Sequence, residues 1–153
     1  MKLVTGCYLL VVCALLAGCG GGGAGDKGDT LYSGAAWTVT LKDGKAHVWR
    51  YVGDKWVIDR SRGVKIEILG PKPGETLTAN PPQVAITMRA TTPLVESALW
   101  VDGKRLLEKG GGTPTNGTIY GAPLKLSPGE HTAVGYARTA SSGSAVAWTF
   151  TAP

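Results

Sequence analysis

The chain has 153 residues and a formal net charge of +5, from 16 basic and 11 acidic side chains. This length suits one domain of ordinary size with tails, and 23 glycines with 9 prolines favour a turn-rich β protein over a helical one. The charges are scattered without a run of like sign, which argues against a nucleic-acid partner. A solvated surface near an anionic membrane is the simpler account of this mild positive charge.

The N-terminal segment 1–18 is predicted to be a secretory signal peptide. Lys2 gives it a positive start, and the apolar stretch 3–16 is shorter than the ~20 residues that span a bilayer. The sequence Leu16-Ala17-Gly18-Cys19 resembles the lipobox of bacterial lipoproteins at all of its positions. The resemblance implies that a diacylglycerol is attached to Cys19 through a thioether and that the leader is cleaved before this residue. The new amino terminus is then usually acylated, with palmitate as the expected fatty acid.

The alternative is a plain signal peptide that is cut elsewhere and leaves Cys19 as an incidental thiol. Cys7 and Cys13 lie inside the leader, so the mature chain holds Cys19 alone. No intramolecular disulfide and no Cys-x-x-Cys metal site can then form. We expect no metal site and no cofactor.

Segment 19–30 is predicted to be the lipidated cysteine followed by a flexible tether. Its glycine-rich stretch 20–25 has no side chains to pack and costs much entropy to order. Gly20 stands where enterobacterial lipoproteins that are retained in the inner membrane carry aspartate, so the resemblance implies the outer membrane in a Gram-negative host. We expect the protein in the bacterial cell envelope, held to the membrane by its lipid.

Segment 31–62 is predicted to be a small three-stranded β-meander. Trp37, Val39 and Leu41 alternate with polar residues, and the turn signals Asp43-Gly44 and Gly53-Asp54 follow. A meander of this size is marginal alone and needs another layer over its apolar face. We expect it to pack on, or extend, the following domain, although an independent platform is the alternative. The side chains available to cover that apolar face are Trp37, Trp49, Tyr51 and Trp56.

Segment 63–153 is predicted to be an immunoglobulin-like β-sandwich. Seven short β-type runs with turn signals between them occur in about ninety residues, which is the strand count of that fold. The runs are 64–69, 84–89, 95–101, 105–107, 120–126, 131–138 and 146–150, with a polar glycine loop at 110–117. Taken together, the chain is predicted to be all-β.

Four short motifs in this segment resemble the bacterial Ig-like domains of secreted and surface proteins. They are Pro71-x-x-Gly74-x-Thr76, Leu99-Trp100-Val101-Asp102-Gly103-Lys104, Leu126-Ser127-Pro128-Gly129-Glu130-His131-Thr132 and Trp148-Thr149-Phe150, and the match covers Val64 to Pro153. The sequence departs from the family at Ala133, Gly135 and Ala137, where larger β-branched residues are usual. Either these small residues or Val134 and Tyr136 therefore face the core.

No constellation of residues points to catalysis. His131 follows a Pro-Gly turn at the start of a strand, where we expect a structural hydrogen bond. No His/Cys/Asp cluster has metal-ligand spacing, the serines lack a nucleophile-elbow context, and the triglycine at 110–112 has neither the lysine nor the helix of a phosphate loop. We therefore predict that the protein is not an enzyme.

The tryptophans are the candidate binding residues: Trp37, Trp49, Trp56 and Trp100. If Leu99 and Val101 face the core, Trp100 faces the other way and either contacts a ligand or is covered by the meander, which we favour. We predict a membrane-anchored envelope lipoprotein whose Ig-like domain binds another envelope or extracellular protein. One alternative is a carbohydrate-binding module, which requires at least two coplanar exposed aromatics. The other is a structural subunit or spacer of a surface assembly, which requires an open strand edge.

Overall fold

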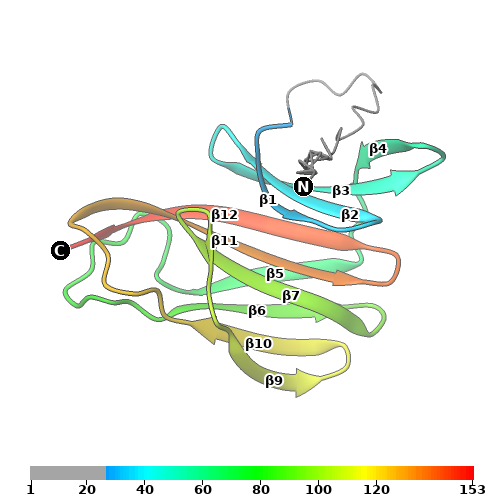
Figure 1. Cartoon of the computed structure of the whole chain (residues 1–153). Helices are drawn as coiled ribbons and strands as arrows, with labels where there is room; N and C mark the ends of the chain where they lie inside the picture. The colour runs from blue at the N-terminus through cyan, green and yellow to red at the C-terminus, as the bar shows by residue number, and fades with distance from the viewer. Residues whose placement is uncertain (1–26) are drawn as a thin grey trace, which may run out of the picture.

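The computed structural model describes residues 27–153, so the signal peptide, Cys19 and most of the predicted tether lie outside the described residues. The described chain forms twelve β-strands in three antiparallel four-stranded sheets (Figure 1). No helix in this part is long and apolar enough to cross a membrane. The prediction of an all-β fold is confirmed.

The first sheet, which we call the N-terminal sheet, has the strand order β1-β2-β3-β4. Its strands are β1 (Asp29–Ser33), β2 (Trp37–Lys42), β3 (Lys45–Val52) and β4 (Lys55–Ile58). Asp43 and Gly44 have φ of 50° and 70°, and Gly53 and Asp54 have 55° and 64°, so both predicted turns have the left-handed backbone of tight hairpins. The sheet has one strand more than predicted, because β1 begins inside the segment predicted as tether.

The other two sheets form the predicted Ig-like β-sandwich, with eight strands in place of seven. The outer sheet consists of β5 (Val64–Gly70), β6 (Val84–Ala90), β10 (Asn116–Gly121) and β9 (Lys109–Thr113), in that order. The central sheet consists of β12 (Gly143–Ala152), β11 (Gly129–Thr139), β7 (Leu94–Val101) and β8 (Lys104–Arg105), in that order.

The central sheet is covered on both faces, which makes the molecule a stack of three layers. One face packs against the outer sheet through a buried cluster that includes Ile86, Leu99, Trp148 and Phe150. The other face packs against the N-terminal sheet, and Figure 1 shows β1 to β4 lying over β11 and β12. This second cluster contains Trp37, Val39, Val48, Ala98, Trp100, Val134 and Tyr136. The expectation that the meander packs on the following domain is confirmed by these contacts.

The register of β11 decides which of its faces meets which layer. Ala133 pairs with Val101 and Gly135 with Leu99, so the small residues face the sandwich core. Val134 and Tyr136 point the other way, toward the N-terminal sheet. The small residues are needed there, because a Cβ at Gly135 would lie 2.9 Å from Ile86 Cδ1.

Replacing Gly135 with alanine is expected to lower the free energy of unfolding by about 1 kcal/mol, because Ile86 is fully buried and has no free space to enter. The measurement is urea unfolding followed by circular dichroism. Gly111→Ala is the matched control, since a Cβ at Gly111 meets nothing within 4 Å. A Gly135→Ala protein as stable as this control would contradict the packing argument.

Two parts of the predicted sandwich were wrong in detail. The run 120–126 does not continue as a strand, because β10 ends at Gly121 and Leu124 is 92% exposed. The predicted glycine loop at 110–117 is instead largely strand, forming most of β9 and the start of β10. Pairing with β10 holds the triglycine in extended form although its residues have low β propensity.

The N-terminal sheet is joined to the sandwich by a hydrogen-bonded group around Asp59, directly after β4. Its carboxylate accepts hydrogen bonds from Ser61 N at 3.0 Å, Ser61 Oγ at 3.1 Å and Gly143 N at 2.7 Å. Ser61 Oγ also makes a short hydrogen bond with Ser142 Oγ. Nearby, Arg50 Nη1 donates to Ser141 O at 2.9 Å. The linker after β4 is therefore fastened to the turn between β11 and β12.

Candidate functional site

The structure separates the four candidate tryptophans into two pairs. Trp100 is 2% exposed and Trp37 is 6% exposed, and both lie between the N-terminal sheet and the central sheet. The prediction that they form a ligand-binding surface was therefore wrong, and the interpretation that the meander covers Trp100 is the one the geometry supports. Trp49 and Trp56 are partly exposed on the opposite face of the N-terminal sheet.

We call Trp49, Tyr51 and Trp56 the aromatic face. Val48 and Ala46 pack toward the central sheet, so Trp49 and Tyr51, at alternate positions of β3, point away from it. Tyr51 pairs with Trp56 across β3 and β4, and their ring centroids lie 5.3 Å apart. Trp49 Nε1 donates a hydrogen bond to Thr40 Oγ1 at 2.9 Å, which fixes the indole against β2.

Lys27 lies over this face at the beginning of the described chain. Its Nζ is 5.2 Å from the Trp49 ring centroid and 5.0 Å from the Trp56 ring centroid. Both distances fall within the range of a cation–π interaction. The Tyr51 and Trp56 rings are inclined at 58° to one another, so this pair is not the coplanar pair that flat sugar stacking requires.

The sequence matches no protein-family model and no curated protein. Several solved structures resemble the fold distantly, among them the following two. CopC from Methylosinus trichosporium OB3b has 17% sequence identity and a TM-score of 0.38, and the match covers 57% of this chain and 93% of that one. A tandem of titin Ig domains has 5% identity and a TM-score of 0.39, and the match covers 80% of this chain and 75% of that one. Likenesses this distant assign neither a ligand nor an activity to this chain.

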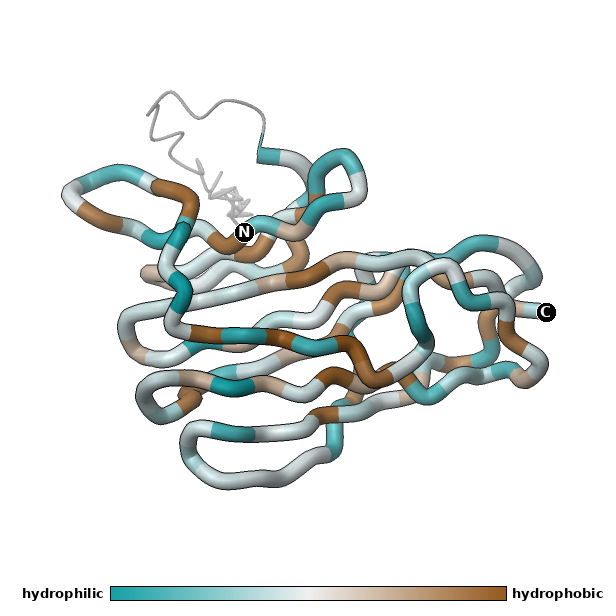
Figure 2. Tube along the Cα trace, turned by 180° about the vertical axis from the view of Figure 1, so that it is seen from behind, coloured by the Kyte–Doolittle hydropathy of each residue, from teal (hydrophilic) through white to brown (hydrophobic). Residues whose placement is uncertain are grey.

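The edge of the outer sheet at β9 is a second candidate, which the sequence analysis missed. Every residue of β9 is exposed, and three of its five residues are glycine. Figure 2 shows the β9–β10 hairpin, lowest in the view, mostly in pale colours because glycine is neither strongly polar nor apolar. Ala90 N donates to Thr115 O at 2.8 Å, so the backbone groups of Thr115 point toward β6. Backbone groups alternate in direction along a strand, so Thr118 points toward β9 and bonds its partner Gly111. The backbone groups of Gly110 and Gly112 therefore point away from β10.

The triglycine in the middle of this edge lacks the usual devices that protect a free strand, whereas Lys109 at its start is a charged edge residue. Natural edges carry inward charges, bulges or prolines that prevent another chain from pairing. Between Lys109 and Thr113, β9 has only hydrogen in place of side chains. The triglycine was the sequence feature that could have indicated this edge. It was predicted to be a loop, so the edge strand was not predicted.

His131 is a structural residue, as predicted. It is 7% exposed, its Nδ1 donates to Asp102 Oδ2 at 2.7 Å and its Nε2 donates to Ser127 O at 2.8 Å. Since both partners are acceptors, the ring satisfies both only when it is protonated. The hydrogen bond to Asp102 raises the pKa of His131 above 6.5, burial opposes this, and the Ser127 carbonyl supports it.

A raised pKa gives the stability a definite pH dependence. The contribution of His131 is fully present below pH 6.5, the unfolded value, and is lost as the pH rises through the higher folded-state pKa. The free energy of unfolding is therefore expected to fall above pH 6.5 in the wild type and to stay flatter in His131→Gln. Urea unfolding between pH 5.5 and 8.5 measures this, with Leu107→Ala, at an exposed side chain that does not titrate, as a control that keeps the wild-type slope. Equal slopes in wild type and His131→Gln would contradict the assignment.

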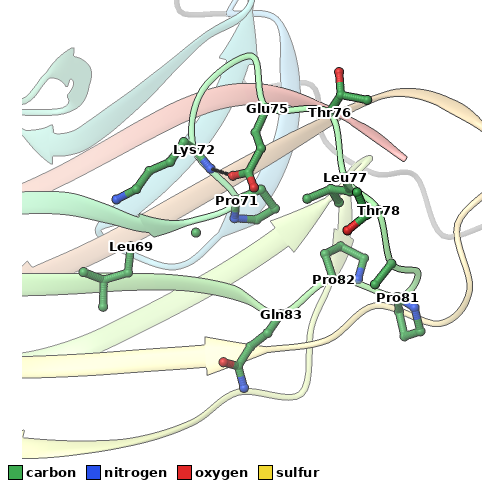
Figure 3. Close-up of a pocket in the computed structure, with 12 residues that line it drawn as sticks. Leu69, Pro71, Lys72, Glu75, Thr76, Leu77, Thr78, Pro81, Pro82 and Gln83 are labelled. Atoms are coloured by element: carbon green, nitrogen blue, oxygen red, sulfur yellow. Dashed lines mark hydrogen bonds between the residues drawn. The ribbon is translucent and has the colours of Figure 1, made fainter. Parts of the chain in front are cut away.

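The β5–β6 connection forms an open cavity of about 560 Å³ at one end of the sandwich. Five of its twelve lining residues are proline or leucine. Figure 3 shows Glu75 turned toward the backbone of Lys72, whose N–H donates to Glu75 Oε2 at 2.6 Å. None of the lining residues carries a buried polar side-chain atom without a hydrogen-bond partner.

The described residues contain no group of three or more His, Cys, Asp or Glu that could hold a metal ion. The group of Asp59, Ser61 and Ser142 has no nitrogen base to activate a hydroxyl. The His131 imidazole, paired with Asp102, has its second nitrogen bonded to a backbone carbonyl. The aromatic face and the β9 edge are consequently the two surfaces with features suited to recognition.

Proposed function

We propose that the protein is a bacterial cell-envelope lipoprotein, anchored through acylated Cys19, whose Ig-like sandwich binds an extended segment of another envelope or extracellular protein. The lipobox resemblance at Cys19 supports the anchor. The observation that supports protein recognition is the exposed glycine edge of β9, where an added strand can pair with backbone groups of Gly110 and Gly112.

The faces of the sheets leave few other places for a protein partner. Both faces of the central sheet are covered. The exposed face of the outer sheet carries mainly polar and charged side chains, among them Lys65, Glu67 and Arg89. Strand addition at β9 uses main-chain hydrogen bonds and does not require an apolar patch.

The anchor is tested by metabolic labelling with palmitate in the host. Cys19→Ala is expected to lose the label because only a thiol forms the thioether, while Cys13→Ala, which changes a cysteine inside the leader, keeps it. Wild-type protein is also expected to stay with membranes after a high-salt wash, since several acyl chains hold it. Label retained by Cys19→Ala would disprove the anchor.

The edge is tested by placing a photo-crosslinking amino acid at Lys109 in cells. A discrete adduct is expected from this position and not from Arg89, which is exposed on β6 in the interior of the same sheet. Equal or absent crosslinking at both positions would refute recognition at the edge. An adduct of twice the mass of the chain would identify a second copy, which is the spacer interpretation.

Glycan binding is the less favoured function. Two of its four candidate tryptophans are buried, the Tyr51 and Trp56 rings are inclined at 58°, and a lysine lies over both remaining indoles. Sugar stacking is disfavoured by each of these features.

A further inference from the structure

The exposed side of the N-terminal sheet has a consistent chemistry that protein recognition at β9 does not use. Its strand positions that point away from the central sheet are Thr30, Thr38, Thr40, Lys42, Lys45, His47, Trp49, Tyr51, Trp56 and Ile58. Among these described positions none is acidic. Thr38 and Thr40 are buried on this side, at 6% and 0% exposure, so its surface is formed by the aromatic and basic positions. Asp43 and Asp54 are exposed in the turns after β2 and β3, at the ends of this surface.

This combination suits the boundary between water and lipid. Tryptophan and tyrosine have an apolar body with one polar end, and they concentrate at the headgroup level of membranes. Tyr51 is 45% exposed and lies next to Trp56. Lys45 is exposed and can direct its ammonium toward lipid phosphates while its carbon stem covers apolar surface. The Lys27 ammonium lies over the two indoles, so its positive charge is at the same face.

The path of the chain determines which side of the molecule is closest to the lipid. Lys27 lies over the Trp49 and Trp56 rings, so the chain leaves the folded part at the aromatic face. Cys19 lies eight residues earlier, and eight extended residues span at most about 29 Å. The outer sheet, two layers away, is on the far side of the molecule from this exit (Figure 1).

We propose that the aromatic face, with Lys27, Lys42 and Lys45, rests on the anionic lipid interface of the membrane that holds the protein. This inference depends on the proposed lipid anchor at Cys19. In that position β9, in the layer opposite the aromatic face, is directed away from the membrane and stays available to a partner. A glycan, a protein partner and a second copy are the other occupants that the experiment must separate.

The test uses the mature lipidated full chain in vesicles of phosphatidylglycerol and phosphatidylcholine, with and without bromine on the upper acyl carbons. Bromolipids quench only indoles that reach the bilayer, and Trp37, Trp100 and Trp148 are buried. We expect quenching in the wild type and its loss in Trp49→Phe/Trp56→Phe. The charge reversal Lys27→Glu/Lys45→Glu is expected to reduce quenching at least about twofold, since each basic group near an anionic surface contributes measurably.

The matched control is Lys72→Glu/Lys125→Glu, which makes the same change in net charge at exposed positions of the sandwich outside β9. It is expected to keep wild-type quenching. Protein that pellets with the vesicles without quenching would leave the anchor intact and overturn the inference, as would equal quenching in purely zwitterionic vesicles. Protein that does not pellet would overturn the anchor itself. A face covered by a second copy would appear as a dimer on chemical crosslinking together with unquenched indoles.

Discussion

Replacing Trp100 with alanine is expected to lower the free energy of unfolding by about 3–5 kcal/mol, the largest effect of any single change described here. The indole is 2% exposed and fills the layer between the N-terminal sheet and the central sheet. Its ring centroid lies 6.3 Å from that of Tyr136 and 5.9 Å from the Arg105 guanidinium carbon. Removing it leaves a cavity that rigid strands on both sides cannot close.

Urea unfolding of Trp100→Ala and Trp100→Phe measures this effect, with the phenyl ring expected to restore part of the loss. Hydrogen exchange adds a regional readout, because the damage should raise exchange in β2 and β3 more than in β5 and β6. Leu124→Ala is the control, since that side chain is 92% exposed. A Trp100→Ala protein within 1 kcal/mol of the control would mean that the layer is not packed as described.

Asp59→Asn is expected to cost about 1.5–3 kcal/mol, the range of hydrogen bonds made to a charged group. The carboxylate accepts from Ser61 N on one oxygen and from Gly143 N on the other. An asparagine side chain has one acceptor oxygen and one NH2 group. In either orientation the NH2 group faces one of the two backbone N–H donors, so one hydrogen bond is lost and two donors face each other. The linker after β4 should loosen and become a site of proteolysis.

Thermal unfolding and limited proteolysis followed by mass spectrometry measure this result. Cleavage is expected between residues 59 and 63 in Asp59→Asn and not in Glu130→Gln, which changes an exposed carboxylate on β11. Unchanged cleavage would show that the packing between the layers, without Asp59, is enough to hold the linker.

Local chemistry made much of the fold predictable. Asp43-Gly44 and Asp102-Gly103 adopt positive φ at both residues, as tight hairpins require. The alternation of Trp37, Val39 and Leu41 identified the side of β2 that packs on the central sheet. Turns and alternation depend on residues that are close together in the sequence, so they can be predicted from the sequence alone.

The errors occurred where local pattern and tertiary pairing disagree. Leu31 and Tyr32 both pack against the second cluster because the register of β1 shifts between Thr30 and Tyr32, and this breaks the period of two. β9 has no side-chain pattern at all and is a strand because β10 pairs with it.

The candidate site was harder to predict than the fold. All four tryptophans were candidate binding residues in the sequence, and the stacking of the layers separates buried Trp37 and Trp100 from partly exposed Trp49 and Trp56. The position of Lys27 over two indoles depends on how the chain enters the sheet. No spacing rule in a single sequence contains that information.

The burial of both faces of the central sheet also limits how this gene can be rearranged. Ig-like units are often joined, duplicated or exchanged as self-sufficient blocks, but here 63–153 alone would display Ala98, Trp100, Val134 and Tyr136 to solvent. An apolar area of that kind promotes aggregation. A recombination boundary near residue 62 would therefore produce an insoluble product, and the two segments are expected to be inherited together as one cassette.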